Sequence, residues 1–309
     1  MKVLIKNIAL FTASLFFCIL SLFSLLSFRS DWIKPTNIRY KPTCAGKLND
    51  RFLESQTIHQ VDILFLGSSH CYRGFDTRLF QNEGITTFNW GSSSQTPIQS
   101  ALILSQCINQ IQPKMIVLEI FPDLYNGNGL ESTLDFISNT GIHSLSNSMM
   151  LQTNEVSGYN TWLYSVIKNA INPKQSIPCD FEMERYVQGG YVEKLKFTPA
   201  SKFSSSPIQL VVNDKQLNAI QYISQQAKNR QIPLVFVLAP MTAEYYNQYQ
   251  NMEEMLEILN PYCDTIINFN PVDSTYQAKH FYDPHHLNQS GVEIFNRQLI
   301  PILKKEFPL

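Results

Sequence analysis

One serine, together with an aspartate and a histidine that lie close to each other in the chain, has the residue types of a nucleophilic catalytic triad. Ser69 follows an apolar run that a glycine closes, and Asp283 and His286 stand three residues apart near the C-terminus. A serine hydroxyl is a poor nucleophile until an imidazole takes its proton, and a third group must hold that imidazole in the right tautomer. The sequence therefore predicts Ser69 as nucleophile, His286 as base and Asp283 as the orienting acid.

The place of the serine in the chain favours this role. The run 61–67 predicts a buried strand, and Gly67 lets the chain turn sharply where that strand ends. Ligands of open α/β sheets gather at the carboxyl ends of the strands, and the amides of the following helix point the same way. Because two serines after a glycine also suit a plain turn and helix cap, the interpretation depends on the second motif.

The second motif is the loop 283–288, with the sequence DPHHLN. We expect a helix to begin directly after it, with Ser290 and Glu293 forming a capping box and an apolar face that docks the loop. An i, i+3 spacing on a turn brings the Asp283 carboxylate within reach of the His286 imidazole. His285 does not fit this spacing.

The histidines and acid near this loop also raise the possibility of a metal site. His280, Asp283, His285 and His286 carry suitable ligand atoms. Adjacent histidines are expected to point apart, and no H-E-x-x-H motif or cysteine pair accompanies them. The sequence therefore predicts no metal and no other cofactor.

Five short apolar runs alternate with helical patterns and predict the fold. The helix 214–230 is expected to start behind an Asp214 cap, and the strand runs are 61–67, 86–91, 115–120, 233–240 and 265–270. This alternation implies right-handed crossovers and an α/β three-layer sandwich with a mainly parallel five-stranded sheet. The stretch 126–212 shows no clear strand run and is interpreted as an insertion, either a substrate wall or lid, or a packing subdomain.

The segment 8–28 carries no charge and is long enough to cross a hydrocarbon core of about 30 Å. Flanking charges favour a single-pass anchor with the globular domain on the extracytoplasmic side, and a cleaved signal peptide is the alternative. The predicted organisation is an anchor at 1–30, a linker with surface turns at 31–60, and an α/β domain at 61–309.

Charge and cysteine usage limit the partners. The chain has 24 Lys and Arg against 25 Asp and Glu and no long basic run. It therefore lacks the cluster of positive charge that binding a nucleic acid requires. Five cysteines lie outside the apolar segment, without the close pairs of a zinc site. One disulfide, such as Cys44 with Cys179, would fit an oxidising compartment, but the sequence does not assign the pair.

Taken in order, the motifs resemble the blocks of the SGNH (GDSL-like) hydrolase and acyltransferase superfamily: G-x-S after the first strand, a glycine after the second, and D-x-x-H before the last helix. The resemblance covers 61–309 apart from the insertion. It implies that Ser69, His286 and Asp283 form the triad. It also implies that the backbone N–H groups of Ser69 and Gly91 form an oxyanion hole.

Two positions depart from the family pattern. Ser68 stands where GDSL enzymes usually carry Asp, and the third-block G-x-N-D is replaced by the sequence EIFPD at 119–123. Asn126 is therefore the candidate side-chain donor of the oxyanion hole by proximity only. The G-S-S tripeptide and the lone anchor are similar to bacterial envelope members of the superfamily, such as teichoic-acid D-alanyl transfer proteins and polysaccharide O-acetyltransferases.

The expected function is a serine-dependent esterase or O-acyltransferase that acts on acyl esters of cell-envelope polymers through an acyl-enzyme on Ser69. Its partners would be the membrane, through 8–28, an acyl donor or acylated glycan, and other envelope-modification proteins. The alternative is a catalytically weak or inactive SGNH-like binding or scaffold protein of an envelope polysaccharide assembly, because the third block is missing.

Overall fold

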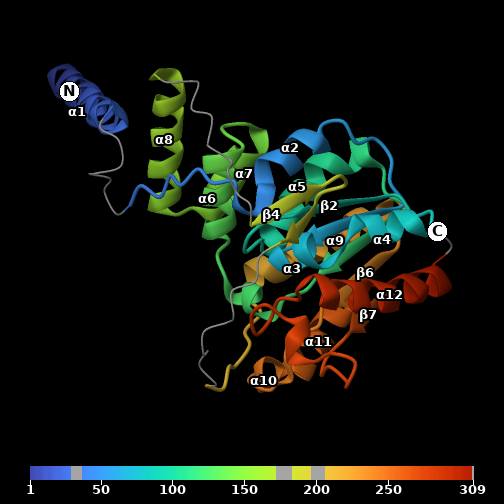
Figure 1. The fold of residues 1–309 in the computed structure, drawn as a ribbon. Helices are drawn as coiled ribbons and strands as arrows, with labels where there is room; N and C mark the ends of the chain where they lie inside the picture. The colour runs from blue at the N-terminus through green and yellow to red at the C-terminus, as the bar shows by residue number, and fades with distance from the viewer. Residues whose placement is uncertain (29–36, 172–182, 196–205, 308–309) are drawn as a thin grey trace.

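The computed structural model describes residues 1–28, 37–171, 183–195 and 206–307 (Figure 1). Its centre is a five-stranded sheet in the order β2-β1-β3-β6-β7, in which every neighbouring pair is parallel. The strands are β1 (Ile63–Gly67), β2 (Thr87–Gly91), β3 (Met115–Glu119), β6 (Leu234–Leu238) and β7 (Thr265–Asn268). The predicted α/β sandwich with a parallel five-stranded sheet is confirmed, and all five strand runs form strands.

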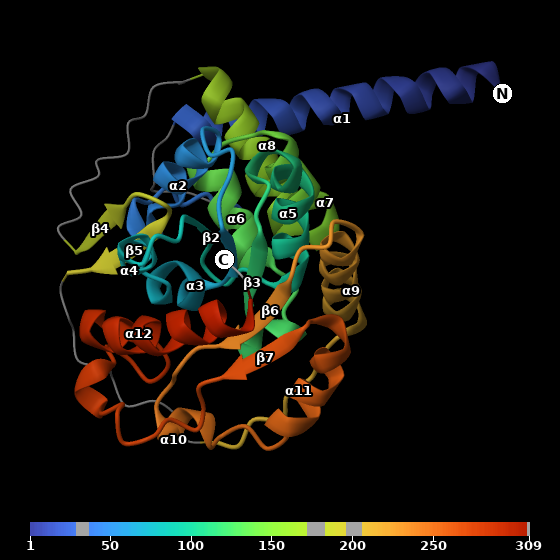
Figure 2. The ribbon, with the colours of Figure 1, turned by 90° about the vertical axis from the view of Figure 1, so that its right-hand side faces the viewer.

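Helices cover both faces of the sheet because successive strand residues point to opposite sides. In β1, Leu64 and Leu66 pack in one core cluster, whereas Ile63 and Phe65 pack in the other. The first cluster involves α2 (Leu48–Ser55), α5 (Pro97–Ile111), α9 (Asp214–Asn229) and α11 (Met252–Leu259). The second involves α3 (Ser69–Gly74), α4 (Thr77–Asn82) and α12 (Gln289–Glu306). Figure 2 shows α3 and α12 on one side of the sheet and α5 and α9 on the other.

The strand order places the predicted nucleophile at a reversal in the topology. From β1 the chain passes to β2 on one side, and then returns to β3 on the other side of β1. Such a switch point leaves a crevice outside the carboxyl ends of the central strands, where ligands of open α/β sheets bind. Gly67 ends β1 and pairs in register with Gly91 at the end of β2.

The predicted insertion contains more regular structure than its sequence pattern indicated. It follows η2 (Pro122–Asn126) and holds α6 (Leu130–Asn139), α7 (Ser144–Thr153) and α8 (Val156–Ile171). It also holds an antiparallel hairpin of β4 (Glu184–Val187) and β5 (Tyr191–Lys194). The expectation of no clear strand run was wrong. Strands of four residues are too short for their alternation of apolar and polar side chains to be recognised in the sequence, and contacts with distant parts of the chain stabilise them. Asn89 of β2, for example, donates its backbone N–H to the Gly189 carbonyl at 2.7 Å.

Two helix caps differ from the prediction. The side chain of Asn288, not Ser290, accepts a hydrogen bond from the Gly291 N–H and begins α12. Likewise Asn213, not Asp214, caps α9 by accepting from the Gln216 N–H. In both cases an asparagine lies just before the expected cap, and its short amide reaches the first free amides of the helix. The shorter connectors are α10 (Ala243–Tyr246), η1 (Ala45–Lys47), η3 (Asn260–Tyr262) and η4 (Ala278–His280).

The N-terminal helix α1 (Lys2–Phe28) is long and apolar enough to cross a membrane over Lys2–Leu22. Among the described residues, Cys44 is disulfide-bonded, and the free cysteines are Cys18 within α1 and Cys71, Cys107 and Cys263 beyond it. Cys179, the partner considered in the sequence analysis, lies outside the described residues.

Candidate active site

The chain turns sharply between β1 and α3, and this turn presents Ser69. Gly67 has a φ of 145°, and a Cβ atom there would meet the Glu119 side chain at 2.7 Å. Only glycine fits a position with both constraints. Ser68 then caps α3 by accepting the His70 backbone N–H, which leaves Ser69 as the first residue of the helix.

The structure brings the three predicted triad residues together. The Oγ atom of Ser69 lies 2.7 Å from Nε2 of His286, and Nδ1 of His286 lies 2.8 Å from Oδ2 of Asp283. The other carboxylate oxygen of Asp283 accepts the backbone N–H groups of His285 and His286 at 3.0 and 2.8 Å. One aspartate therefore shapes the loop and orients the imidazole, so that Nε2 of His286 faces the serine hydroxyl.

Two aromatic rings hold the His286 imidazole between them. The His70 ring is stacked on it with a centroid distance of 4.3 Å and an interplanar angle of 7°. The Tyr282 ring is also stacked with His286, at 5.2 Å and 8°. Burial in this environment lowers the pKa of His286 to about 4, against the opposing effect of the hydrogen bond to Asp283. The imidazole is therefore neutral at pH 7 and available to accept the proton of Ser69.

For Asp283, the effect of hydrogen bonds and neighbouring histidines on the pKa is larger than the effect of burial. Partial burial raises it, but the hydrogen bond with His286 and the nearby His285 outweigh that effect and hold the pKa at about 2. The carboxylate stays ionised throughout the range in which His286 works as a base. An ionised acid beside a neutral imidazole is the starting state that a general-base mechanism requires.

The candidate oxyanion hole is only partly assembled. Gly91 lies against the nucleophile turn, since a Cβ atom there would meet the Ser68 carbonyl at 3.0 Å. Its N–H is engaged, however, and donates to the Asn89 side chain at 3.2 Å. The Ser69 amide is at the free N-terminus of α3, where helix amides point outward.

The structure does not support Asn126 as the side-chain donor. It is exposed at the end of η2 and lines a hollow with Gly127, Asn213 and Lys215. None of the triad residues lines that hollow. Proximity in sequence to the end of β3 is therefore not enough to assign Asn126 to the oxyanion hole.

Three histidines meet at the site, which corrects the expectation that adjacent histidines point apart. A ring nitrogen from each of His70, His285 and His286 lies within 4.8 Å of those of the other two. Their hydrogen bonds already engage both nitrogens of His286 and both of His70. Metal binding by all three would therefore require breaking a contact of His286, either with Ser69 or with Asp283.

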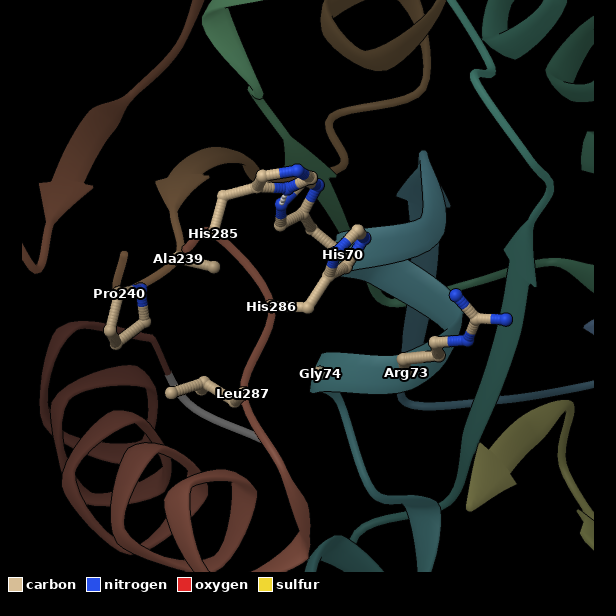
Figure 3. Close-up of a pocket in the computed structure, with 8 residues that line it drawn as sticks. All are labelled: His70, Arg73, Gly74, Ala239, Pro240, His285, His286 and Leu287. Atoms are coloured by element: carbon tan, nitrogen blue, oxygen red, sulfur yellow. Dashed lines mark hydrogen bonds between the residues drawn. The ribbon is translucent and has the colours of Figure 1, made fainter. Parts of the chain in front are cut away.

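A small cavity lies behind these rings. Its volume is about 10 Å³, and its lining is His70, Arg73, Gly74, Ala239, Pro240, His285, His286 and Leu287. Figure 3 shows the three imidazole rings gathered on the same side, with the Arg73 guanidinium pointing away from them. A space of this size holds a single water molecule at most, so it is no substrate pocket.

The hairpin β4-β5 of the insertion contacts the site. Glu184 of β4 forms an ion pair with Arg73 of α3, and Arg73 also donates to the Tyr282 hydroxyl at 3.1 Å. Lys194 of β5 lies over the Tyr282 ring, 4.0 Å from its centroid. The insertion thus contacts one of the two rings that flank His286.

Four residues that surround the triad were not predicted from the sequence as part of the site: Ser68, His70, Glu119 and Tyr282. Glu119 is the most informative, because it is buried and accepts both the backbone N–H and the hydroxyl of Ser68, at 2.8 and 2.7 Å. Burial raises its pKa to about 7, against these hydrogen bonds. A carboxylate at the end of a buried strand was a signal that could have identified it, since an acid there is rarely without a partner.

No family model matches the chain, and no curated protein matches it in sequence at a significant level. Sixteen chains of solved structures are similar to it, including the following three. A GDSL-like lipase from Bacteroides thetaiotaomicron VPI-5482 is 11% identical, with a TM-score of 0.44, over 85% of this chain and 99% of that one. A protein assigned as a platelet activating factor from Streptococcus pneumonia is 13% identical, with a TM-score of 0.43, over 83% and 91%. A protein assigned as an acylhydrolase from Bacteroides fragilis NCTC 9343 is 10% identical, with a TM-score of 0.40, over 90% and 99%. These similarities concern the fold alone, so the functional assignment depends on the geometry of Ser69, His286 and Asp283.

Proposed function

We propose that this protein is a serine-dependent ester hydrolase or O-acyltransferase of the SGNH type, with an acyl-enzyme on Ser69. The main observation in support is the continuous chain of hydrogen bonds from Ser69 through His286 to Asp283. His286 takes the hydroxyl proton as Ser69 attacks an ester carbonyl, and then gives it to the leaving alcohol. Water or a second hydroxyl then attacks the acyl group, with His286 again as the base.

A fluorophosphonate probe and an aryl acetate test this proposal on the full-length protein in detergent. We expect stoichiometric labelling of Ser69, located by peptide mass, and a burst of the aryl alcohol followed by slower turnover. Labelling should require a folded site and fail in urea. An intact protein that neither takes up the probe nor cleaves the ester would contradict the assignment.

A specific observation favours the second candidate, a weak or inactive SGNH-like scaffold. The Gly91 N–H is engaged by Asn89, and the side chain of Asn126 lies elsewhere, so two of the three expected oxyanion donors are not aimed at the site. Loss of one such donor costs about 10²- to 10³-fold in kcat. A scaffold would show the triad geometry without labelling, which is the outcome that separates the two candidates.

We further propose that the domain lies on the extracytoplasmic side of a membrane and acts on acyl esters of envelope polymers, together with other envelope-modification proteins. The apolar helix α1 supports an anchor, and the disulfide at Cys44 supports an oxidising compartment. Protease added outside intact spheroplasts should digest the domain and leave a membrane-bound fragment of residues 1–30. Protection of the domain until the membrane is lysed would place it on the other side.

A further inference from the structure

A second hydrogen-bonded row of side chains runs beside the triad. It starts at Glu119, the last residue of β3, which accepts the hydroxyl of Ser68 at 2.7 Å. The Ser68 Oγ atom lies 3.1 Å from Nδ1 of His70, and Nε2 of His70 lies 3.0 Å from Nδ1 of His285. The row therefore joins a buried carboxyl on the sheet to the loop that carries Asp283 and His286.

The proton count along this row fixes the state of His285. The single hydroxyl proton of Ser68 is directed to the Glu119 carboxylate, so Ser68 can only accept from His70, and Nδ1 of His70 carries a proton. Burial and the neighbouring histidines lower the pKa of His70 well below its usual value, so the ring is neutral and its Nε2 is an acceptor. His285 must then donate through Nδ1. Burial also lowers the pKa of His285, which leaves a lone pair on its Nε2.

This acceptor nitrogen lies next to the triad. The His285 ring lies 4.2 Å from the His286 ring, centroid to centroid, and its side chain is 26% exposed. Nε2 of His285 is 3.9 Å from Oδ1 of Asp283, which is beyond hydrogen-bond distance. Because Nδ1 of His285 contacts His70, Nε2 is the nitrogen of this ring that remains to contact a water molecule. A water molecule that donates to two acceptors at hydrogen-bond distance spans about 4.5 Å between them.

We propose that Nε2 of His285 binds the water molecule that attacks the acyl group on Ser69, so that the site favours hydrolysis over transfer. Glu119 is the positioning residue that makes this nitrogen an acceptor. The water oxygen bonds to the acyl carbon, and one water proton moves to His286 while the other is held by His285. The bond from the acyl carbon to Ser69 Oγ then breaks, His286 returns its proton to that oxygen, and the acid leaves. The inference deepens the proposed function and rests on it.

Protonation of Glu119 reverses the direction of every hydrogen bond along this row of side chains. Protonated Glu119 donates to the Ser68 hydroxyl, and Ser68 then donates to Nδ1 of His70. His70 in turn donates from Nε2 to Nδ1 of His285. The proton of neutral His285 then lies on Nε2, which can no longer accept a hydrogen bond from water. The groups facing Glu119 are Cys71 of α3 and Tyr125 of η2, and the pKa values of both are raised far enough to keep them neutral in this range. Asp123 and Asp283 face His285, and the lowered pKa of Asp283, about 2, keeps that carboxylate ionised. Because burial raises the pKa of Glu119 to about 7, the water-binding state is populated above neutral pH and lost below it.

The experiment measures how the acyl-enzyme divides between water and added methanol, with an aryl acetate as donor. Water has two protons to place, whereas methanol has only the one that His286 takes. His285→Asn keeps an N–H donor toward His70 and removes the acceptor. We expect this variant to raise the ratio of methyl ester to free acid about tenfold or more at pH 8, with slower hydrolysis as the cause. In the wild type the ratio should fall as pH rises through about 7, and Glu119→Gln should abolish that dependence.

His280→Asn is the matched control. His280 is buried in η4, and among the described residues its Nδ1 accepts only the local Gln277 N–H, a role that asparagine can take over. Its ratio should equal that of the wild type. An unchanged ratio in His285→Asn would overturn the water-binding role, and a pH dependence that persists in Glu119→Gln would overturn the positioning role. A wild type without a burst or fluorophosphonate labelling would instead overturn the proposed function itself.

Discussion

Replacing Ser69 with alanine is expected to lower kcat/KM for an acyl ester by about 10⁴- to 10⁶-fold. The substitution removes the only hydroxyl at hydrogen-bond distance from Nε2 of His286 within the described part of the chain. Without it no acyl-enzyme forms, and the remaining rate comes from binding and from whatever donors face the oxyanion. The measurement is ester hydrolysis by the purified full-length protein, together with the burst amplitude, which should vanish.

Ser105→Ala is the control for this variant. Ser105 lies on the exposed face of α5, and its hydroxyl donates only to the Leu102 carbonyl one turn earlier. It loses the same oxygen atom without touching the site, so its activity should equal that of the wild type. A Ser69→Ala protein that kept a tenth or more of the activity would show that another group is the nucleophile.

Replacing Asp283 with asparagine is expected to lower kcat by about 10³- to 10⁴-fold while the fold is retained. The amide nitrogen would donate to Nδ1 of His286, which drives the ring proton onto Nε2. In that tautomer His286 can no longer accept from Ser69. The asparagine oxygen can still accept the backbone N–H groups of His285 and His286, so the loop should keep its shape. The measurements are kcat at saturating ester and the thermal midpoint.

Asp273→Asn provides a matched comparison. Asp273 accepts the Thr275 N–H in the same kind of short turn, is fully exposed, and has no contact with the triad. Asparagine fits such turns, so both activity and stability should be unchanged. If Asp283→Asn kept full activity while Ser69→Ala had none, the general base would not depend on Asp283. His285 would then become the candidate for that base.

The sequence was sufficient for the parts of the site that depend on short-range patterns. Asp283 and His286 are three residues apart on one turn, so their contact follows from local geometry. The contact between Ser69 and His286 spans 217 positions in the chain. It was still predictable, because parallel strands align their carboxyl ends and both motifs follow such strands. Asn126 was named only by its proximity in sequence to β3, and it lines a hollow that none of these three residues lines.

Sequence alone thus predicted the five strands of the central sheet, their parallel arrangement and the three residues first singled out, because apolar runs and turn motifs are patterns of neighbouring positions. Only the tertiary structure decided what surrounds those residues. Glu119 reaches Ser68 because β1 and β3 are adjacent, a pairing that no single strand pattern specifies. The stacking of His70 and Tyr282 on His286 likewise depends on how α3 docks against the loop before α12. These side-chain contacts depend on packing at distances of a few ångströms, and such packing exists only once the whole sheet and its helices are assembled.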